Sequence, residues 1–483
     1  MKNIFKIITI ATALIVSTGM LSSCKKDLEL KAPYQLTGAN AYQNLDAYVN
    51  QLNGVYGSFA SANYYNGFLS CTAECLTDNV YETVESLVNY QQVANWIYLP
   101  NDGYMASVWA QPYNVIYQAN IIINGIDAFK SEGESKYNRA LGQALAARAI
   151  AHFDLLKAFA PELDRNSTKP GITIKTNTDI AFPARNTVKE VYDAVYADLN
   201  KAISLLSNTD IVINSGSTRA YIDVYGAKAA LAKVALYAKD YPTAITNATA
   251  CIAQYPLAST ANFPGIWNDS KVNEVIWSIQ NNSGDPGSPF PSADIMSFRF
   301  TRNTFGIHPS LLTLYNQAND IRFSTYFFIK NTVGGTNNYA LQKFRGKGAA
   351  SDNLVNFKVF RTGEMYLIRA EAYANTAGQD ANANADLNTL KAARITGWVN
   401  TAYAGAALTT AIEDERRREL AGEGHRWFDL KRTTRTINRP TAGLGNPNAQ
   451  IKTTLAASSP KWAWPIPEAE IRANGSMLQN DGY

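Results

Sequence analysis

The sequence contains little of what catalytic, metal-binding or nucleic-acid-binding proteins usually need. It has only 3 His and 4 Cys in 483 residues, and 17% of its residues are charged. No Walker phosphate loop, dinucleotide fingerprint or HExxH metal pair occurs in the chain. The formal charge of +4 is close to neutral, which gives no support for nucleic-acid binding. We therefore expect no cofactor, no metal and no nucleic-acid partner.

Long apolar runs are also absent, apart from one near the N-terminus. Lys2 and Lys6 precede an apolar run over residues 7–16, which small residues follow. A helix of that length spans roughly half of a 30 Å hydrocarbon core, so the run is too short to cross a membrane comfortably. The order of charged, apolar and small residues is typical of a secretory signal.

The predicted signal ends in a sequence that is similar to a lipobox, Leu21 to Cys24. In such a motif the small residues admit the signal peptidase, and lipid is attached to the Cys thiol. Each buried acyl CH₂ contributes about 0.8 kcal/mol, so several acyl chains anchor a protein firmly. We expect a signal peptide over 1–23 and a lipidated tether over 24–39. The alternative is an ordinary signal with a chance Cys24.

The three remaining cysteines do not suggest a disulfide scaffold. Cys71, Cys75 and Cys251 are odd in number, so they cannot all pair within one chain. With so few His in the sequence, no second ligand pair stands near Cys71 and Cys75 for zinc. We expect all three to be small buried side chains.

Apolar residues recur at helical spacing along most of the chain, which predicts a mainly α-helical protein. The predicted helices cover 40–57, 106–129, 137–159, 187–207, 220–238, 241–254, 363–376, 383–394 and 407–434. A short buried strand is expected from Glu274 to Ile279. The Gly-, Asn-, Ser- and Pro-rich stretches over 281–291 and 331–353 predict loops.

Two of the predicted helix pairs fit a tetratricopeptide-type hairpin, in which small residues let two helices approach closely. The first pair matches the pattern at Leu231, Ala232, Ala235, Tyr241, Ala244 and Pro256. The second pair fits more loosely, at Tyr366, Ala370, Tyr373 and Gly378. No even 34-residue array is present, so other structure must interrupt the repeats.

Charged residues from 413 to 419 have the spacing of surface ion pairs. Glu413 lies four residues before Arg417, and Asp414 lies four before Arg418. An acid four residues before a base is the favourable order on a helix, so we interpret them as solvated pairs. We expect His425 to be a hydrogen-bonded structural residue, because no Ser or Cys nucleophile motif accompanies it.

Several longer segments resemble the SusD/RagB family. They are LTDN from Leu76, QALAARAIAHFDLLKAF from Gln143, KVNEVIWSIQ from Lys271, EMYLIRAEAYA from Glu364, ERRRELAGEGHRWFDLKR from Glu415 and WPIPEAEIRANGSMLQNDGY from Trp464. The resemblance implies a mainly α, SusD-like fold of tetratricopeptide-type helical hairpins with an irregular loop-rich lobe and a small β element. That domain would cover 40–483, with an N-terminal region at about 40–255 and a C-terminal region at about 260–483.

The resemblance also implies a role. Such proteins are lipid-anchored in the outer membrane, face the cell exterior, and deliver glycans, or in some members peptides, to a SusC-like TonB-dependent transporter. They do not act as enzymes. The main alternative is a scaffold whose tetratricopeptide-type surface docks other proteins.

Ligand-binding residues can be suggested only by position and by chemistry, because sugar faces stack on flat rings and sugar hydroxyls bind amides. The candidates are Trp96, Tyr98, Tyr64, Tyr65, Trp267, Phe290, Phe298, Arg299, Asn281 and Asn303. For Trp96, packing in the core is an equal alternative. A glycosidase would need two carboxylates across a cleft, but Asp78, Glu82, Glu85 and Asp102 have no supporting motif.

Overall fold

A computed structural model describes residues 41–86, 90–281, 304–333, 335–347, 354–441 and 452–483, and most of them are helical. The helices are α3 (Leu45–Phe59), α4 (Phe68–Cys75), α5 (Gln91–Ala94), α6 (Gly103–Gly125), η1 (Ile126–Glu132), α7 (Glu134–Phe159), α8 (Val188–Ser207), α9 (Val224–Tyr237), α10 (Tyr241–Gln254), α11 (Phe263–Ile266), α13 (Pro309–Leu312), α14 (Ile321–Tyr326), α15 (Thr362–Ala374), α16 (Asp380–Ala392), α17 (Gly405–Glu419), α18 (Arg426–Arg432), η2 (Pro460–Trp462) and α19 (Glu468–Ala473). The predicted mainly α fold is confirmed.

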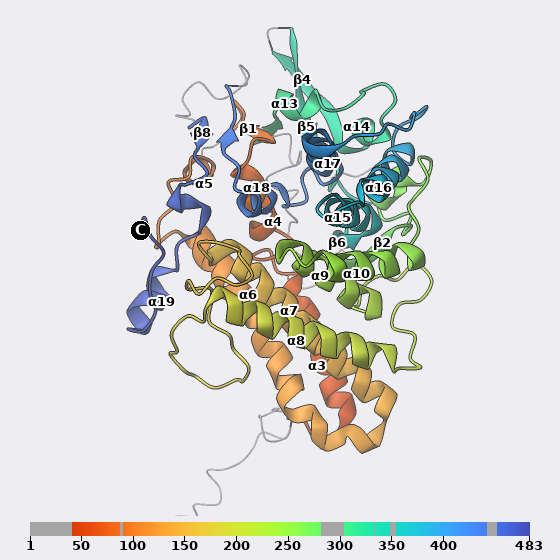
Figure 1. The fold of residues 1–483 in the computed structure, drawn as a ribbon. Helices are drawn as coiled ribbons and strands as arrows, with labels where there is room; N and C mark the ends of the chain where they lie inside the picture. The colour runs from red at the N-terminus through yellow and green to blue at the C-terminus, as the bar shows by residue number, and fades with distance from the viewer. Residues whose placement is uncertain (1–40, 87–89, 282–303, 334, 348–353, 442–451) are drawn as a thin grey trace, which may run out of the picture. The chain divides into compact units, whose positions relative to one another are not determined.

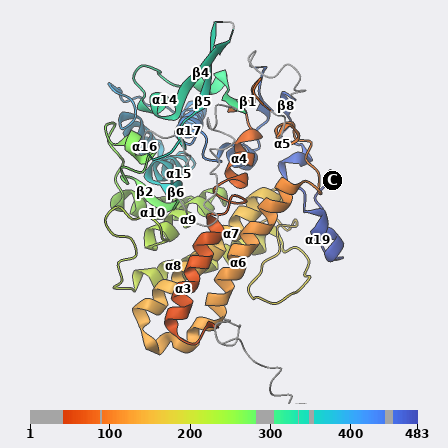
Figure 2. The ribbon, with the colours of Figure 1, turned by 180° about the vertical axis from the view of Figure 1, so that it is seen from behind.

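The long helices α3, α6, α7 and α8 lie side by side (Figures 1 and 2). Helix α7 is rich in buried alanines, which let its neighbours approach closely. At Gly142 in α7 an added Cβ would lie 2.7 Å from Leu206 Cγ, so glycine permits the contact with α8. Helix α8 begins at a capping box between Thr187 and Glu190, which satisfies backbone N–H groups at its first turn.

The two predicted helical hairpins are present as α9–α10 and α15–α16, and α10 packs against α15 (Figure 1). Asp223 and Asp240 accept hydrogen bonds from the first backbone N–H groups of α9 and α10. The turn between α15 and α16 contains Gly378 at a φ of +76°, a left-handed conformation that favours glycine. The alanines of the pattern lie buried between the helices, as the tetratricopeptide spacing predicts.

The prediction of one helix over 407–434 is wrong, because the chain breaks between α17 and α18. Gly422 and Gly424 both have a φ of +79° there, which ends a right-handed helix. Their backbone N–H groups each donate to Glu74 Oε1 over 3.1 Å. An added Cβ at Gly424 would lie 2.7 Å from Ser70 Cα, so this close approach to α4 requires glycine.

The small β element consists, within the described part of the chain, of antiparallel two-stranded sheets. The pairs are β1 (Val80–Glu82) with β3 (Phe305–Ile307), β2 (Val275–Ile279) with β6 (Phe357–Arg361), β4 (Phe327–Val333) with β5 (Thr336–Leu341), and β7 (Ile437–Asn438) with β8 (Thr454–Leu455). The strand expected at Glu274 to Ile279 is confirmed as β2.

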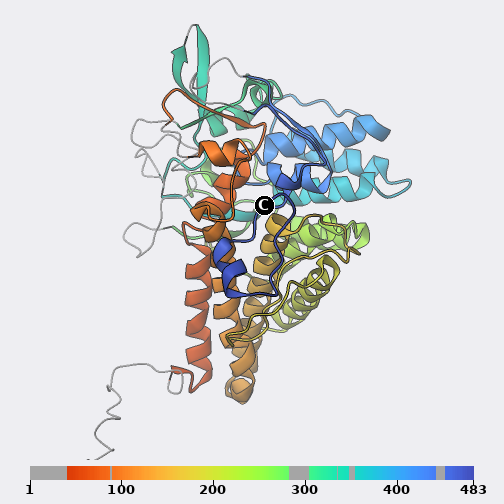
Figure 3. The same ribbon diagram turned by 90° about the vertical axis from the view of Figure 1, so that its left-hand side faces the viewer.

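The loop predicted over 331–353 is partly wrong, because its first half forms most of the β4–β5 hairpin, which projects at the top of Figure 3. Its Asn-rich sequence suggested a loop. Gly335, at a φ of +80°, lies in the connection between the strands, and buried Ala340 and Leu341 anchor β5. Most of the other predicted loop, 281–291, lies outside the described residues.

A network of buried charges joins α17 to the rest of the core. The carboxylate of Glu419 is fully buried, and its Oε2 lies 2.8 Å from Arg322 Nη1. Arg361 and Arg394 also form ion pairs with Glu419. Arg394 Nη2 in addition lies 2.8 Å from Glu274 Oε2. Burial alone would raise the pKa of Glu419, but the guanidinium groups of Arg394, Arg361 and Arg322 hold it well below its usual value.

The interpretation of 413–419 as solvated i,i+4 pairs is therefore wrong. Glu413 pairs with Arg435 in place of Arg417. Arg418 binds Glu415 three residues earlier, at 2.7 Å, in place of Asp414. The spacing on the helix suggested i,i+4 pairs, whereas Glu413 and Arg417 bind partners that are distant in sequence, Arg435 and Asp78.

The C-terminal end of α7 is closed by residues from the end of the chain. The ammonium group of Lys431 donates to the carbonyl oxygens of Lys157 and Ala160, at 2.7 Å each. The backbone N–H of Trp464 donates to Ala158 O over 3.0 Å, and Asn480 Nδ2 donates to Phe159 O over 2.7 Å. These donors satisfy carbonyl groups that a helix end leaves open.

Cys71, Cys75 and Cys251 lie buried as small core side chains, as expected. In the described ranges, none of the helices combines the length and the apolar character that a membrane span requires.

Candidate functional site

The predicted ligand residues Trp96 and Tyr98 lie in the core. Trp96 is 2% exposed, its indole N–H donates to Leu76 O over 3.0 Å, and the guanidinium carbon of Arg439 lies 4.3 Å from the ring centroid. Tyr98 is fully buried and its hydroxyl donates to Lys461 O. Neither ring offers an open face to a sugar in this conformation. Both rings pack in the protein core, which for Trp96 was the alternative to a ligand-binding role.

Tyr64, Tyr65 and Asn281 form hydrogen bonds in and around the segment that precedes α4. The two tyrosine hydroxyls both donate to Asp154 Oδ2 over 2.7 Å, and their rings stack with centroids 4.6 Å apart. Asn281 exchanges hydrogen bonds with the side chain of Asn66, at 2.7 and 3.0 Å. These polar groups are satisfied within the protein, and they connect the segment before α4 to Asp154 of α7 and to Asn281, just after β2.

Trp267 is also buried in the core. The ammonium group of Lys343 lies 4.4 Å from the centroid of its ring. The ring contacts Phe344, which stacks on Phe357, and Phe357 contacts Tyr65. A continuous run of rings therefore connects two of the predicted positions. Phe290, Phe298, Arg299 and Asn303 lie outside the described residues.

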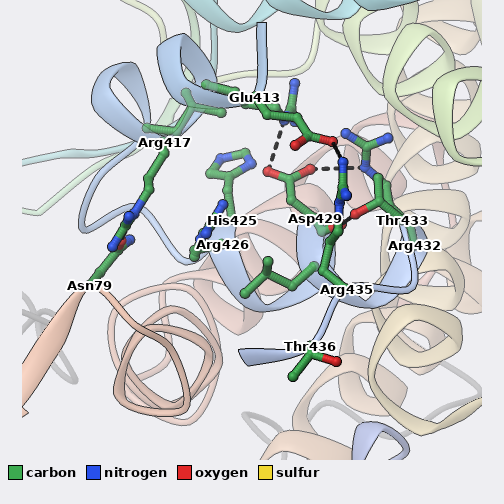
Figure 4. A pocket seen from close by; sticks show the side chains of 13 residues that line it. Asn79, Glu413, Arg417, His425, Arg426, Asp429, Arg432, Thr433, Arg435 and Thr436 are labelled. Carbon is green, nitrogen blue, oxygen red and sulfur yellow. Dashed lines mark hydrogen bonds and ion pairs between the residues drawn. The ribbon is translucent and has the colours of Figure 1, made fainter. Parts of the chain in front are cut away.

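A pocket of about 240 Å³ lies where α17 and α18 meet Asn79 (Figure 4). Five guanidinium groups line it, those of Arg416, Arg417, Arg426, Arg432 and Arg435. Such a concentration of arginines would suit an anion if the charges were not already compensated.

Acidic side chains compensate the arginines of this pocket. Asp429 binds Arg416 at 2.8 Å and Arg432 at 2.9 Å, and Figure 4 shows Asp429 next to Arg432. The guanidinium of Arg426 donates to both carboxylate oxygens of Asp78, at 2.9 Å each. Arg417 Nη2 lies 3.3 Å from the same carboxylate. The pocket is therefore a junction of ion pairs that ties residue 78 to the C-terminal half.

The titration behaviour of this junction agrees with a structural role. Burial raises the pKa of Asp78, but Arg417 and Arg426 outweigh that effect and lower it to about 2. Burial, together with the positive charges of Lys233 and Arg416, lowers the pKa of His425 well below its usual value, so the imidazole is neutral near pH 7. A carboxylate held ionised cannot serve as the general acid of a glycosidase.

Glu74 is a carboxyl group whose pKa burial raises, but it is inaccessible. Burial raises the pKa of Glu74, whose oxygens accept hydrogen bonds from Asn79 and from the backbone of Gly422 and Gly424. Its side chain is fully buried, so no substrate reaches it. Within the described ranges, no group of three or more His, Cys, Asp or Glu side chains is arranged to hold a metal ion.

A second hollow, which we term the α6 groove, presents exposed apolar side chains. It has a volume of about 370 Å³ and lies between α6, residues 173–183 and the C-terminal segment. Tyr117 (47% exposed) and Phe182 (59%) line it, and Ile180 (92%) and Leu478 (64%) adjoin it. Clustered exposed apolar side chains of this kind mark interaction surfaces.

Hydrogen bonds hold the loop of the α6 groove in place. Asn120 Nδ2, from α6, donates to Lys175 O and Asn177 O over 3.1 and 3.0 Å. Asn474 Nδ2 donates to Pro183 O over 2.8 Å. Sequence reasoning missed this surface because Tyr117 follows the helical spacing of core residues; the isolated apolar residues of 180–182 were the available signal.

Comparison with known proteins shows one consistent similarity. A family model described as the SusD family matches residues 302–483, and one described as "starch-binding associating with outer membrane" matches residues 28–236. SusD-like protein P38 of Formosa agariphila is 25% identical over 545 aligned residues, which cover 99% of each chain. SusD-like protein P2 of the same organism is 22% identical and covers 89% of this chain and 91% of its own.

Solved structures show the same fold. A SusD superfamily protein from Bacteroides thetaiotaomicron superposes with a TM-score of 0.80 at 24% identity, covering 90% of this chain and 99% of its own. A laminarin-binding SusD-like protein superposes with a TM-score of 0.70 at 23% identity, covering 92% of this chain and 100% of its own.

Proposed function

The chain belongs to the SusD/RagB family, and from this premise we propose that it binds a glycan at the cell surface and delivers it to a SusC-like TonB-dependent transporter. The single observation that carries the proposal is that two models of SusD-type proteins match successive parts of one chain. One of these models describes starch binding, and a structural neighbour binds laminarin, so a carbohydrate ligand is favoured over a peptide.

The structure supports binding without catalysis. The acidic side chains of the charged junction are paired with arginines, and Glu74 is inaccessible. We propose that the protein holds oligosaccharide without shortening it, attached to the outer membrane through lipid on Cys24.

Glycan binding is tested with the purified mature chain and a panel of soluble starch, laminarin, xylan and mannan. Isothermal titration calorimetry should detect binding to at least one of them. Chromatography after long incubation should show unchanged oligosaccharide. Failure to bind any glycan of the panel would overturn the glycan proposal, and protein-dependent cleavage would overturn the claim that catalysis is absent.

The transporter partner has a candidate docking surface in the α6 groove. Aliphatic side chains such as Ile180 and Leu478 are exposed there, and they suit an apolar protein surface better than a hydroxyl-rich sugar. This observation also favours the second candidate function, a protein-interaction scaffold, and both roles are compatible in one chain.

Gentle detergent extraction followed by mass spectrometry should recover the protein together with a TonB-dependent barrel. Phe182→Ala combined with Ile180→Ser should weaken that complex, because it removes two exposed apolar contacts. Repeated recovery of the wild-type protein alone, while other outer-membrane complexes survive, would contradict the transporter partnership.

A further inference from the structure

A third hollow is lined by residues of α16, of α17 and of the segment that connects them; Figure 1 labels both helices. We term it the Trp398 hollow; Asn316, Trp398, Tyr403, Ala407, Thr410 and Asp414 are among the residues that line it. Its volume of about 600 Å³ lies within the range of small-ligand sites, roughly 300 to 1,000 Å³.

Two aromatic rings are held at the hollow by a buried ammonium group. Lys391 is 4% exposed, and its Nζ lies 4.7 Å from the ring centroid of Trp398 and 5.3 Å from that of Tyr403. Both rings are only half-buried, so each is supported from inside the protein and partly open to solvent. Rings fixed in this way bind a ligand without losing side-chain freedom on binding.

Asparagine side chains fix the backbone that carries these rings. Asn388 Oδ1 accepts from Trp398 Nε1 and from the backbone N–H of Thr401, at 3.0 Å each. One helical turn earlier, Asn384 Oδ1 accepts from the backbone N–H of Tyr403 over 2.8 Å, and its Nδ2 donates back to Tyr403 O over 2.9 Å. The connection between α16 and α17 is therefore rigid over the residues that present the rings.

The floor and rim of the hollow suit a sugar. Ala406 and Ala407 on α17 are small, so they leave space beside the rings. Asp414, in the part of the chain that the structure describes, makes no hydrogen bond or ion pair within the protein, so its oxygens are available to accept hydroxyl groups. Besides Asp414, the two rings and the buried Lys391, the described lining has acceptor or donor side chains at Asn316, Thr410 and Arg418.

The charge of the hollow disfavours an acidic ligand. The guanidinium of Arg418 is already bound to Glu415 at 2.7 Å, and Lys391 is buried beneath the rings. The carboxylate of Asp414 is therefore the least compensated charge of the rim, and it would repel a uronate or a sulfate ester.

We propose that the Trp398 hollow is a binding site for a neutral glycan, with a sugar ring packed on Trp398 and Tyr403 and a sugar hydroxyl donating to Asp414. This inference rests on the proposed function and deepens it by naming a site and a substrate class. Sequence reasoning missed both rings because they lie between two predicted helices, in a segment to which no role was assigned.

The test compares Trp398→Ala, Trp398→Phe and Tyr403→Ala with the wild-type chain, using whichever of starch, laminarin, xylan and mannan the wild type binds. Each alanine variant should lose about tenfold or more in affinity, because one ring of a preorganised pair is removed. Trp398→Phe keeps a flat ring and should retain most of the affinity. Tyr117→Ala, in the α6 groove, is the matched control and should bind glycan as the wild type does.

Asp414→Asn provides an independent readout of the predicted hydroxyl contact. A hydrogen bond to a charged acceptor is stronger than one to a neutral amide, so affinity for the neutral glycan should fall by roughly threefold. Any binding of polygalacturonate should rise in the same variant, because the repelling charge is gone.

The possible outcomes separate the two proposals. Circular dichroism and melting temperature establish that each variant is folded, and Tyr403→Ala replaces Trp398→Ala should the latter fail to fold. Wild-type affinity in both folded alanine variants would overturn the site while the proposed function stands. Absence of glycan binding by the wild-type chain would overturn the proposed function and this site with it.

Discussion

Single aromatic residues show how burial decides between two interpretations of one sequence pattern. Trp96 follows amide side chains and precedes Pro100. This sequence context is equally compatible with a ring that binds sugar and with a ring packed in the core. The structure surrounds the ring, and its N–H is bonded to Leu76 O. Sequence could not settle the matter, because the residues that cover Trp96 include Arg439, more than 300 positions away.

Replacing Trp96 with alanine should destabilise the protein without removing its ligand site. A buried Trp cut to Ala loses about 3 to 5 kcal/mol of unfolding free energy. The backbone at residue 96 has a φ of 58°, which is strained for Trp and for Ala alike. The measured loss of unfolding free energy therefore reflects lost packing of the side chain. Urea unfolding should show the loss, with Tyr117→Ala as the control that stays within about 1 kcal/mol. Normal stability with lost glycan affinity would restore the platform interpretation.

Asp78 should make the protein sensitive to acid. Arg417 and Arg426 lower its pKa to about 2 against the effect of burial, below the ordinary value of 3.8. A carboxyl group with a lowered pKa stabilises the folded state fully above the unfolded pKa, and this contribution is lost as pH falls from about 4 towards 2. The shift corresponds to about 2 kcal/mol.

The test measures unfolding free energy from pH 5 to pH 2 for the wild type, Asp78→Asn and Asp210→Asn. Asp78→Asn should be less stable at pH 5 because Arg417 and Arg426 lose their partner, but its curve should fall about 2 kcal/mol less on acidification. Asp210→Asn, at an exposed position, should follow the wild-type curve. Parallel curves for the wild type and Asp78→Asn would show that the pair does not govern acid sensitivity.

At the scale of elements, local periodicity predicts helices well and their charged partners poorly. Helices α8 and α10 lie within one residue of their predicted bounds, because an amphipathic face and its capping residues are local features. Helix α17 ends early because Gly424 must approach α4, and its Glu419 binds Arg322, Arg361 and Arg394. These contacts depend on the whole fold, so spacing within 407–434 could not reveal them.

The buried charges of α17 should contribute far more to stability than its exposed ones. Glu419→Gln leaves three guanidinium groups without a shared carboxylate, which should cost about 3 to 5 kcal/mol. Glu413→Gln breaks the outer pair with Arg435 and should cost less than about 1 kcal/mol. Denaturant unfolding compares the two, and equal losses would contradict the role assigned to the buried network.

The family resemblance predicted the mainly α fold of the whole molecule, whereas its ligand contacts could not be predicted from the sequence. Long motifs such as the one from Glu415 identify the fold because they build its charged core. The Trp398 hollow depends on two asparagines of α16 and on Lys391, none of which has a recognisable motif. Such sites arise from the arrangement of ordinary residues.

Lipid attachment at Cys24 remains a prediction for the whole molecule. Cys24→Ala should move the protein from the membrane fraction to the soluble fraction, because lipid can no longer be attached to the thiol. Cys251→Ala, which alters a buried thiol only, is the control and should stay with the membranes. Fractionation with a lipid label measures both. A labelled Cys24→Ala protein that still sediments with membranes would contradict the anchor.

The closure of α7 by the end of the chain has a consequence for biogenesis. The carbonyl groups at Lys157 to Ala160 receive donors from Lys431, Trp464 and Asn480. The ribosome makes those donors long after α7, so the C-terminal end of this helix lacks them until the segment from Lys431 to Asn480 has been added. A chain that ended before Lys431 would lack these donors, and Phe159 O would keep only its hydrogen bond from Arg185 Nη2. The order of synthesis thus delays completion of this helix end until the C-terminal segment exists.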